Sequence, residues 1–244
     1  MQDKYVGDIG DYGKLGLLRR LQNAGLTIGV NWYLTPDETH KGDGRFTHYQ
    51  QYQNCDKALY CALQEIIAKD SRKVSSLKTD SILHAVFFPE SLKYTSKAKA
   101  KRISFRQEWH KRALRYLDGL DIVFVDPDNG LLVPSAKETC RDNKYVTPEE
   151  LEGYYRQGAT VIYYQHKARR KDPYYMDQHT KLMHSGCFPG VTGLGLKFRP
   201  VSQRYYFFLI QPEHYAMVRA VVDEMLASPW GQGVTPAFSE LKQV

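Results

Sequence analysis

The sequence predicts an α/β fold in which a mostly parallel sheet carries helices on both faces and an antiparallel hairpin at one edge. Short, continuous apolar runs such as 122–125 alternate with longer segments whose apolar residues recur at helical spacing. Uninterrupted apolar runs are typical of strands that are buried on both faces, as in a parallel sheet. With 244 residues, the chain is long enough for a single domain, 1–244, with a small inserted basic lobe near 89–103 and 131–146.

The first half of the chain is expected to alternate helix and strand. The expected elements are a helix carrying Leu15 to Ala24, a strand over 27–34, a helix over 56–69, a strand over 82–88 and a helix that ends at Gly119. Asp11 is the predicted N-cap of the first helix, and Gly25 lies just past its end. Residues 104–107 resemble a capping box at the start of the last of these helices, so the segment 93–102 before it is expected to form an exposed loop.

The second half continues this alternation after the apolar run at 122–125. The expected elements are a loop or small lobe over 131–146, a helix from Thr147 to Gly158, strands over 160–166, 191–199 and 204–210, a helix over 174–185, and a last helix between Pro212 and Ser228. The helix that starts at Thr147 has a cap, a proline at its first position and a glutamate that completes a capping box. The tail 231–244 is expected to be loosely held. The last helix is expected to turn five apolar side chains inward: Met217, Val218, Val221, Val222 and Met225.

The composition excludes several classes of protein. An aromatic fraction of 13% and the lack of low-complexity tracts argue against disorder. No apolar run approaches the length of a membrane span, and the first residues are charged, so neither membrane insertion nor a secretory signal is expected. The four cysteines have neither zinc-site nor CxxC spacing, which predicts reduced thiols and a cytoplasmic location.

Basic residues outnumber acidic ones and are clustered, with a net charge of +7. The candidate nucleic-acid-binding residues are Lys97, Lys99, Lys101, Arg102 and Arg106 in one cluster, and Lys167, Arg169 and Arg170 in the other. Such clusters suit a polyanion, so DNA or RNA is the expected partner; a solvated helix face is the alternative. Trp109 lies among the first cluster and is either a core residue or a platform on which a base stacks.

The strongest candidate for a functional site is the turn that follows the apolar run 122–125. This turn lies at the carboxyl end of a predicted strand, the edge at which open α/β sheets bind ligands. A second predicted strand, 160–166, brings His166 to the same edge. The predicted catalytic residues are therefore Asp126, Pro127, Asp128, Asn129 and His166. An ordinary turn is the alternative, because Asp, Pro and Asn are common turn residues.

Two further polar segments extend the candidate site. Asp8, Asp11 and Lys14 surround the start of the first helix, where backbone N–H groups and a lysine can hold an anion. A plain capped helix is the simpler explanation of these residues. Asp37 and Asp43 lie in a long polar loop after the strand over 27–34, and loops of this kind tend to be functional. The loop lacks the GxGxxG fingerprint of a dinucleotide-binding sheet.

The order of these motifs resembles that of the large-subunit ribosomal RNA adenine-N6 methyltransferases, whose fold is Rossmann-like. That family opens with a Gly/Asn-Asp-Lys helix start, and this chain has Gly10-Asp11-Tyr12-Gly13-Lys14. A strand with an acidic, glycine-containing loop comes next, as at Gly42-Asp43-Gly44. A later strand of the family ends in Asp-Pro-Pro-Tyr, where this chain has Asp126-Pro127-Asp128-Asn129. A Gly-Thr strand follows in the family, and Gly158-Ala159-Thr160 takes the corresponding place.

The resemblance implies an S-adenosylmethionine-dependent methyltransferase acting on a base amino group of DNA or RNA. Asp126 would accept a hydrogen bond from that amino group. The residues implied in cofactor binding are Asp8, Asp11, Lys14, Asp37 and Asp43. In Asn129 the chain departs from the family, which has a base-stacking tyrosine there, and Asp128 adds a charge that the family lacks.

Two other functions remain open from the sequence. Asp128 favours a nuclease or phosphodiesterase, in which Asp126 and Asp128, with His166, would bind Mg or Mn and activate water. The other alternative is a non-catalytic nucleic-acid-binding protein on a degenerate methyltransferase fold.

These interpretations lead to two structural expectations. Asp126, Asp37 and His166 should lie along one carboxyl edge of the sheet, because each follows a predicted buried strand. Replacing Asp126 with alanine should leave the fold nearly intact, because a turn carboxylate contributes little to core packing.

Overall fold

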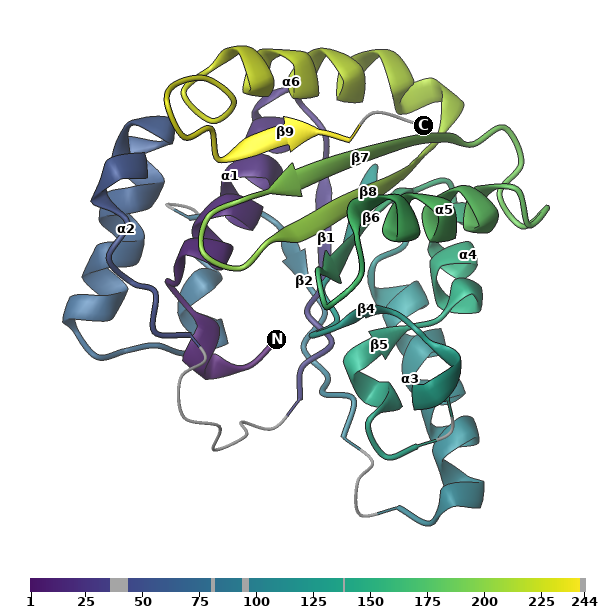
Figure 1. Ribbon diagram of the computed structural model, residues 1–244. Coiled ribbons are helices and arrows are strands. Elements are labelled where there is room, and N and C mark those ends of the chain that lie inside the picture. Colours follow the sequence, from purple (N-terminus) through teal and green to yellow (C-terminus); the bar gives the residue numbers. More distant parts are fainter. Residues whose placement is uncertain (36–43, 80–81, 94–96, 138, 242–244) are drawn as a thin grey trace.

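A seven-stranded sheet runs through the structure, a computed structural model that describes residues 1–35, 44–79, 82–93, 97–137 and 139–241. The strands stand in the order β2-β1-β3-β6-β8-β7-β9 (Figure 1). Their bounds are Ile28–Asn31 (β1), Val86–Phe87 (β2), Ile122–Val125 (β3), Thr160–His166 (β6), Thr192–Phe198 (β7), Arg204–Ile210 (β8) and Phe238–Glu240 (β9). β8 and β9 run antiparallel to the other strands, so the predicted α/β fold with a mostly parallel sheet is confirmed.

The order of the strands reverses between β1 and β3. β1 pairs in parallel with β2 on one side and with β3 on the other. Open α/β sheets bind ligands at the carboxyl ends of the two strands that flank such a reversal. Asp126, directly after β3, donates its backbone N–H to the carbonyl of Asn31 at the end of β1, 2.9 Å away. The predicted catalytic turn therefore begins at this switch point.

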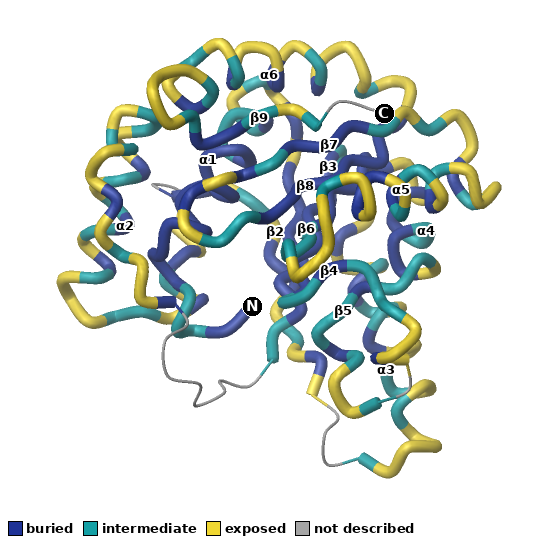
Figure 2. The backbone as a smooth tube through the Cα atoms, in the orientation of Figure 1, coloured by how far each residue is buried: buried dark blue, intermediate teal, exposed yellow. Residues whose placement is uncertain are grey.

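Helices cover both faces of the sheet (Figure 1). Their bounds are Ile9–Asn23 (α1), Lys57–Ala68 (α2), Lys99–Tyr116 (α3), Pro148–Arg156 (α4), Asp172–Met183 (α5) and Tyr215–Ala227 (α6). Phe124 of β3 packs into a core with α1, α2 and α6, whereas Val123 and Val125 pack into a second core with α3, α4 and α5. Because successive side chains of a strand point to opposite faces, one apolar run supplies both cores. Figure 2 shows the strands of the sheet largely buried and the outer surfaces of the helices exposed.

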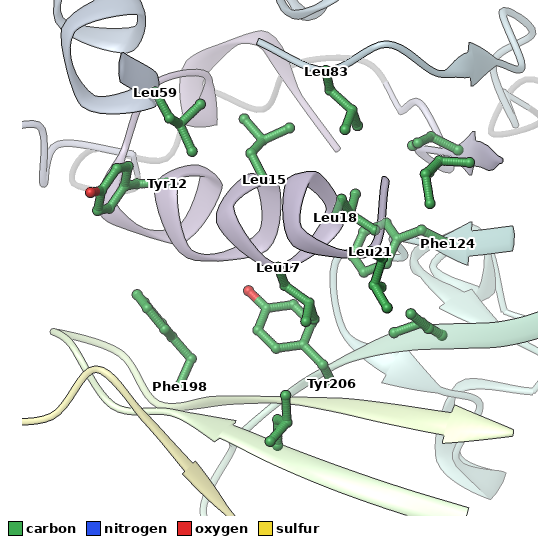
Figure 3. Close-up of a cluster of buried hydrophobic side chains, with 14 of the residues drawn as sticks. Tyr12, Leu15, Leu17, Leu18, Leu21, Leu59, Leu83, Phe124, Phe198 and Tyr206 are labelled. Carbon is green, nitrogen blue, oxygen red and sulfur yellow. The ribbon is translucent and has the colours of Figure 1, made fainter. Parts of the chain in front are cut away.

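Helix α1 lies deep in the first core, and glycines allow its close approach to the sheet. In Figure 3, Leu15 and Leu18 point towards Leu59 and Leu83, whereas Leu17 lies beside Tyr206 of β8. A Cβ atom at Gly13 would lie 2.5 Å from the ring of Phe198, and one at Gly16 would lie 2.3 Å from the ring of Trp230. Both distances are too short for any side chain, so these glycines are needed for packing.

Several predicted elements are confirmed almost residue for residue. The helix over 56–69 is α2, which Asp56 caps, and the strand over 160–166 is β6. Thr147 and Glu150 form the predicted capping box of α4. Gly25 and Gly158 follow α1 and α4 with φ of 96° and 92°, a left-handed conformation that favours glycine at helix ends.

Two predicted helix starts are wrong. α1 begins at Ile9, and its N-cap is Asp8, whose side chain accepts a hydrogen bond from the backbone N–H of Asp11 at 2.9 Å. α3 begins at Lys99, so Ser104 lies inside the helix and its hydroxyl donates to the carbonyl of Lys101, 3.2 Å away. Lysine, alanine and arginine are good helix formers, and they extend α3 into the segment that was expected to be a loop.

The predicted hairpin exists, but it is not at the sheet edge. β7 pairs with β8 on one side and with β9 on the other, so the tail supplies the edge strand. Trp230 and Phe238 are buried, and the tail up to 241 is therefore held more firmly than expected. Met217 of α6, which was expected to face inward, is 43% exposed. On the opposite edge, β2 is only two residues long.

A second, two-stranded sheet lies in the region that was expected to form a loop or small lobe. β4 (Gly130–Leu131) pairs in parallel with β5 (Tyr145–Val146). The described residues also form short 3-10 helices. Their bounds are Asp3–Tyr5, Gln50–Cys55, Val74–Leu77, Pro134–Ala136, Asp142–Lys144 and Pro212–His214.

Two general features of the chain can be read from the structure. Within the described ranges, no helix is both long enough and apolar enough to cross a membrane. All four cysteines are free thiols.

Candidate functional site

A cavity of about 400 Å³ opens at the carboxyl edge of the sheet, over the switch point between β1 and β3. It is lined by predicted residues from three parts of the chain: Asp8, Asp11, Lys14, Asp126, Pro127, Asp128, Asn129 and His166. The expectation that Asp126 and His166 share one edge is therefore confirmed. Asp37 and Asp43 lie outside the described residues.

Local hydrogen bonds hold the turn after β3 in place. Gly130 has φ of 112°, and a Cβ atom there would lie 2.3 Å from the side-chain oxygen of Gln165. That oxygen accepts the backbone N–H of Leu131 at 2.9 Å, and the Gln165 amide donates to the carbonyl of Asn129 at 3.0 Å. The backbone N–H of His166 also donates to Asn129, at 3.2 Å. The end of β6 thus fixes the turn, and Gln165 does so through its side chain.

Lys14 of α1 lies between two carboxylates at the wall of the cavity. Its Nζ donates to Oδ2 of Asp126 at 2.7 Å and lies 3.2 Å from Oδ1 of Asp11. All three side chains are almost fully buried. Burial lowers the pKa of Lys14, but Asp126 and Asp11 raise it by more, so its pKa lies above its ordinary value. Lys14 is therefore a permanent cation held by α1 against the end of β3.

Asp11 differs from the other two residues because one of its buried carboxylate oxygens lacks a hydrogen bond among the described residues. Burial raises its pKa to about 7, against the lowering effect of Lys14. Its Oδ1 is buried without a hydrogen-bond partner among the described residues, despite the nearby Lys14 ammonium. Its Oδ2 accepts the backbone N–H of Gly7, at 3.2 Å. A carboxyl group in these surroundings can hold or release a proton near neutral pH.

The position of Asp126 changes one expectation from the sequence. Asp126 is 4% exposed and neutralises a buried lysine. Removing one partner of a buried ion pair leaves the other charge uncompensated, which is strongly destabilising. Asp126→Ala is therefore not expected to leave the fold intact. From its position in a turn Asp126 was expected to contribute little to core packing, because no local pattern shows that α1 brings Lys14 against it.

Asp128 also lines the cavity and lies among hydrogen-bond donors. Its Oδ1 accepts from the amino group of Met1 at 2.9 Å, its Oδ2 accepts from Gln2 at 3.2 Å, and Lys144 lies 4.0 Å away. Burial raises the pKa of Asp128, but the Met1 amino group and Lys144 outweigh it, so its pKa lies below its ordinary value. Within the described ranges, no three His, Cys, Asp or Glu side chains are grouped as a metal site requires. Both predicted metal ligands lie against cations instead.

The cavity is also lined by residues that the sequence did not single out as candidates, above all Arg204. Arg204 begins β8 and pairs in register with His166 at the end of β6, because the two strands are antiparallel. Its guanidinium contacts the hydroxyl of Ser202 at 2.8 Å and packs so closely on α1 that a Cβ at Gly10 would lie 1.5 Å from Nη1. The predicted hairpin was the available signal, since an antiparallel strand beside β6 must start at this edge.

Two aromatic groups complete the lining of the cavity. The ring of Tyr164 lies 5.9 Å from Nζ of Lys14, and its hydroxyl lies 3.5 Å from Nδ1 of His166. Phe46 lines the mouth and is 52% exposed, which is unusual for a phenylalanine. The cavity therefore offers charged groups of both signs together with flat apolar surfaces.

The predicted nucleic-acid-binding residues divide into two groups. Arg106 is engaged inside the protein: its guanidinium bonds Glu150 at 2.6 and 2.8 Å and the backbone carbonyls of Asp142 and Tyr145. It is therefore removed from the predicted phosphate contacts. Exposed positions are occupied by Lys99, Lys101, Arg169 and Arg170, and partly exposed ones by Lys97, Arg102 and Lys167.

Trp109 does not provide a platform for a base. It is fully buried in the second core, and its indole N–H donates to the carbonyl of Glu90 at 3.1 Å. The alternative that it is a core residue is therefore confirmed.

Comparison with models of protein families finds no family that matches this chain, and comparison with curated proteins finds no significant relative.

Proposed function

We propose that this chain is an S-adenosylmethionine-dependent methyltransferase that modifies a base amino group in a nucleic acid. One observation carries the proposal: Asp126-Pro127 directly follows β3 at the switch point of the sheet and lines a cavity of about 400 Å³. This is the place that the resemblance gives to the catalytic Asp-Pro. The mostly parallel sheet with its antiparallel hairpin of β7 and β8 is consistent with the Rossmann-like fold that the same resemblance implies.

The chemistry of the cavity suits an adenosyl amino acid. Such a cofactor carries a carboxylate, an ammonium, ribose hydroxyls and a flat base. Arg204 can hold the carboxylate, Asp8 can accept from the ammonium or the hydroxyls, and Phe46 or Tyr164 offers a ring for the base. The volume lies in the range of about 300–1,000 Å³ that is usual for small-molecule sites. When bound, the cofactor supplies an electrophilic methyl group.

The residues around Asp126 are arranged to bind an amino group. Among the described residues, Lys14 bonds only Oδ2 of Asp126, which leaves Oδ1 to accept from a substrate amine. Lys14 also fixes the orientation of the carboxylate, since it is held in turn by α1 and Asp11. A carboxylate that accepts an N–H bond keeps electron density on the nitrogen as that nitrogen attacks. Asp11, whose pKa is about 7, can hold a proton in the same network.

Asp126→Asn tests the proposal with little change of shape. The wild type should bind S-adenosylmethionine in isothermal titration and transfer radiolabelled methyl groups to RNA or DNA. Asp126→Asn should lower transfer at least about 100-fold while cofactor affinity changes little, because the lost group acts on the amine. Asp128→Asn is the matched control and should keep most of the transfer activity. Absence of cofactor binding in the folded wild type would contradict the proposal.

A non-catalytic nucleic-acid-binding protein is the second candidate, and the Lys14–Asp126 ion pair favours it. A carboxylate at 2.7 Å from a buried lysine is also what a purely structural pair would look like. This candidate predicts nucleic-acid binding without cofactor binding, and equal nucleic-acid affinity in the wild type and Asp126→Asn.

The nuclease with Mg or Mn gains no specific support from the described residues, because Asp128 is bound to the Met1 amino group and Gln2. It predicts divalent-ion binding that Asp128→Asn abolishes.

A further inference from the structure

A second cavity, of about 390 Å³, lies between α3 and the segment that contains β4 and β5. Its lining shares no residue with the cavity at the switch point. Ile103, Gln107 and His110 line it from α3, whereas Leu132 and Lys137 line it from the opposite side. It has the volume of a small-ligand pocket and opens on the helix that carries the first basic cluster.

The apolar part of this cavity is partly open to water. Ile103 is 55% exposed although it lies on the cavity wall. Leu132 is only partly buried on the facing segment. These two apolar side chains on the wall of an open cavity offer surface on which a flat ring can pack.

His110 also lines this cavity, but both of its ring nitrogens are buried, and Nε2 lies against Gly153 of α4. Neither ring nitrogen has a hydrogen-bond partner among the described residues. Burial lowers the pKa of His110, so at neutral pH the ring is uncharged and has one donor and one acceptor. The exposed side chains of Gln107 and Glu149 add further donors and acceptors around it. Gln107 and Glu149 can therefore bond the polar edge of a heterocyclic base, which an alkyl chain lacks.

The charges at the rim suit an anion. Arg106 is neutralised by Glu150 at 2.6 Å, so it contributes little net charge. Arg102 donates from Nε to the carbonyl of Lys97 at 3.1 Å, which fixes its guanidinium at the cavity. Lys137 is exposed on the opposite rim. The exposed Lys99 lines the cavity as well, so Lys99, Arg102 and Lys137 outnumber Glu149, the lining carboxylate that Arg106 does not neutralise.

We propose that this second cavity receives one unpaired nucleotide of a single-stranded nucleic acid, with the base packed against Ile103 and Leu132 and the phosphate at Arg102 and Lys137. A base stacked in a duplex cannot enter a pocket of this kind, so the substrate is unpaired or locally opened. The inference rests on the proposed function only for its nucleic-acid substrate. It adds a site that holds a nucleotide other than the one that reacts.

Cross-linking locates the nucleotide directly. An oligonucleotide of about 10 residues that contains 4-thiouridine is irradiated with the full-length protein, and the linked peptides are identified by mass spectrometry. Links are expected in peptides that carry residues 99–110 or 132–142. Links confined to other peptides, such as the one with residues 167–171, would overturn the inference.

Affinity measurements test the contacts with matched variants. Ile103→Ala should weaken single-strand binding about five- to tenfold by fluorescence anisotropy, since it removes apolar surface from the base site. Tyr116→Ala is the control, because Tyr116 lies on the same helix, is 51% exposed and does not line this cavity. Lys137→Ala should lower the salt dependence of binding by about one counterion, whereas Lys111→Ala, outside the cavity on α3, should not.

Three results would overturn the inference: equal affinities of Ile103→Ala and Tyr116→Ala, equally tight binding of duplex and single strands, or no binding of any oligonucleotide at low salt. Cofactor binding by the same wild-type preparation is measured separately. If the cofactor does not bind but the cross-links persist, the proposed methyltransferase function fails and the nucleotide site stands.

Discussion

Two buried ion pairs of this protein resemble each other in charge and differ in how completely they are hydrogen-bonded. Around Glu150, Arg106 bonds both carboxylate oxygens, and Oε2 also accepts from Tyr33 at 2.9 Å and from the backbone N–H of Thr147 at 3.0 Å. Around Lys14, among the described residues, Asp126 is bonded through Oδ2, and Oδ1 of Asp11 lies 3.2 Å from Nζ of Lys14 but has no hydrogen bond.

This difference in hydrogen bonding indicates a structural role for the Arg106–Glu150 pair and a role in ligand binding for the residues around Lys14. The Arg106–Glu150 pair joins α3 to the start of α4 and uses its hydrogen-bonding capacity within the protein. The group formed by Lys14, Asp11 and Asp126 lies at the sheet edge where open α/β sheets bind ligands, and it does not use all of its carboxylate oxygens for hydrogen bonds among the described residues. Buried polar groups are rarely left unsatisfied without a reason, and a ligand that completes the bonds is such a reason.

Glu150→Ala should have the largest effect on stability. It leaves the Arg106 charge uncompensated in a buried site and also removes the acceptor of Tyr33 and of the α4 cap. The free energy of unfolding, measured by urea denaturation, should fall by about 3–5 kcal/mol. A loss below 1 kcal/mol would show that water reaches this pair and would remove the contrast between the two regions.

Asp126→Ala should destabilise the fold by a smaller amount, about 2–4 kcal/mol. Asp11 remains beside Lys14 at 3.2 Å and can take over part of its neutralisation. The measurement is again urea denaturation, with Asp126→Asn as the comparison of nearly equal size. An unchanged midpoint for Asp126→Ala would restore the sequence-based expectation that this carboxylate is a simple turn residue.

Asp11→Asn should change the pH dependence of stability. The pKa of Asp11 rises from 3.8 to about 7 on folding. The unfolded chain therefore releases this proton first, so the stability from Asp11 is fully present below pH 3.8 and is lost as pH rises to about 7. Relative to Asp11→Asn, the wild type should lose about 2 kcal/mol between pH 5 and pH 7. Parallel stability–pH curves for the two proteins would contradict this view of Asp11.

Thr147→Ala should have the smallest effect, about 1 kcal/mol, because it removes one capping hydrogen bond to the backbone N–H of Glu150. The Arg106–Glu150 bonds do not depend on this hydroxyl. Thermal unfolding of Thr147→Ala and of Thr147→Ser, which keeps the hydroxyl, measures the cap by itself. A loss near that of Glu150→Ala would mean that the cap, and not the ion pair, holds this region.

Local patterns were sufficient for most of the fold. The apolar run at 122–125 and the Thr147 capping box are each determined by residues close in sequence, and the structure has both as predicted. Predictions were wrong where a short local pattern pointed to one structure and residues farther along the chain determined another. Ser104 looked like a cap, but the good helix formers before it extend α3 to Lys99. The tail looked loose because its partner, β7, lies about forty residues earlier in the chain.

The sequence by itself determined that polar residues gather where β3 and β6 end, because a strand that ends in a polar turn places that turn at a sheet edge. Only the tertiary structure decided how those residues are paired. Lys14 meets Asp126 across 112 positions of sequence, and Arg204 meets the end of β6 because β8 runs antiparallel to it. Contacts between distant residues depend on how helices pack on the sheet, and neither local propensity nor hydrophobic period contains that information.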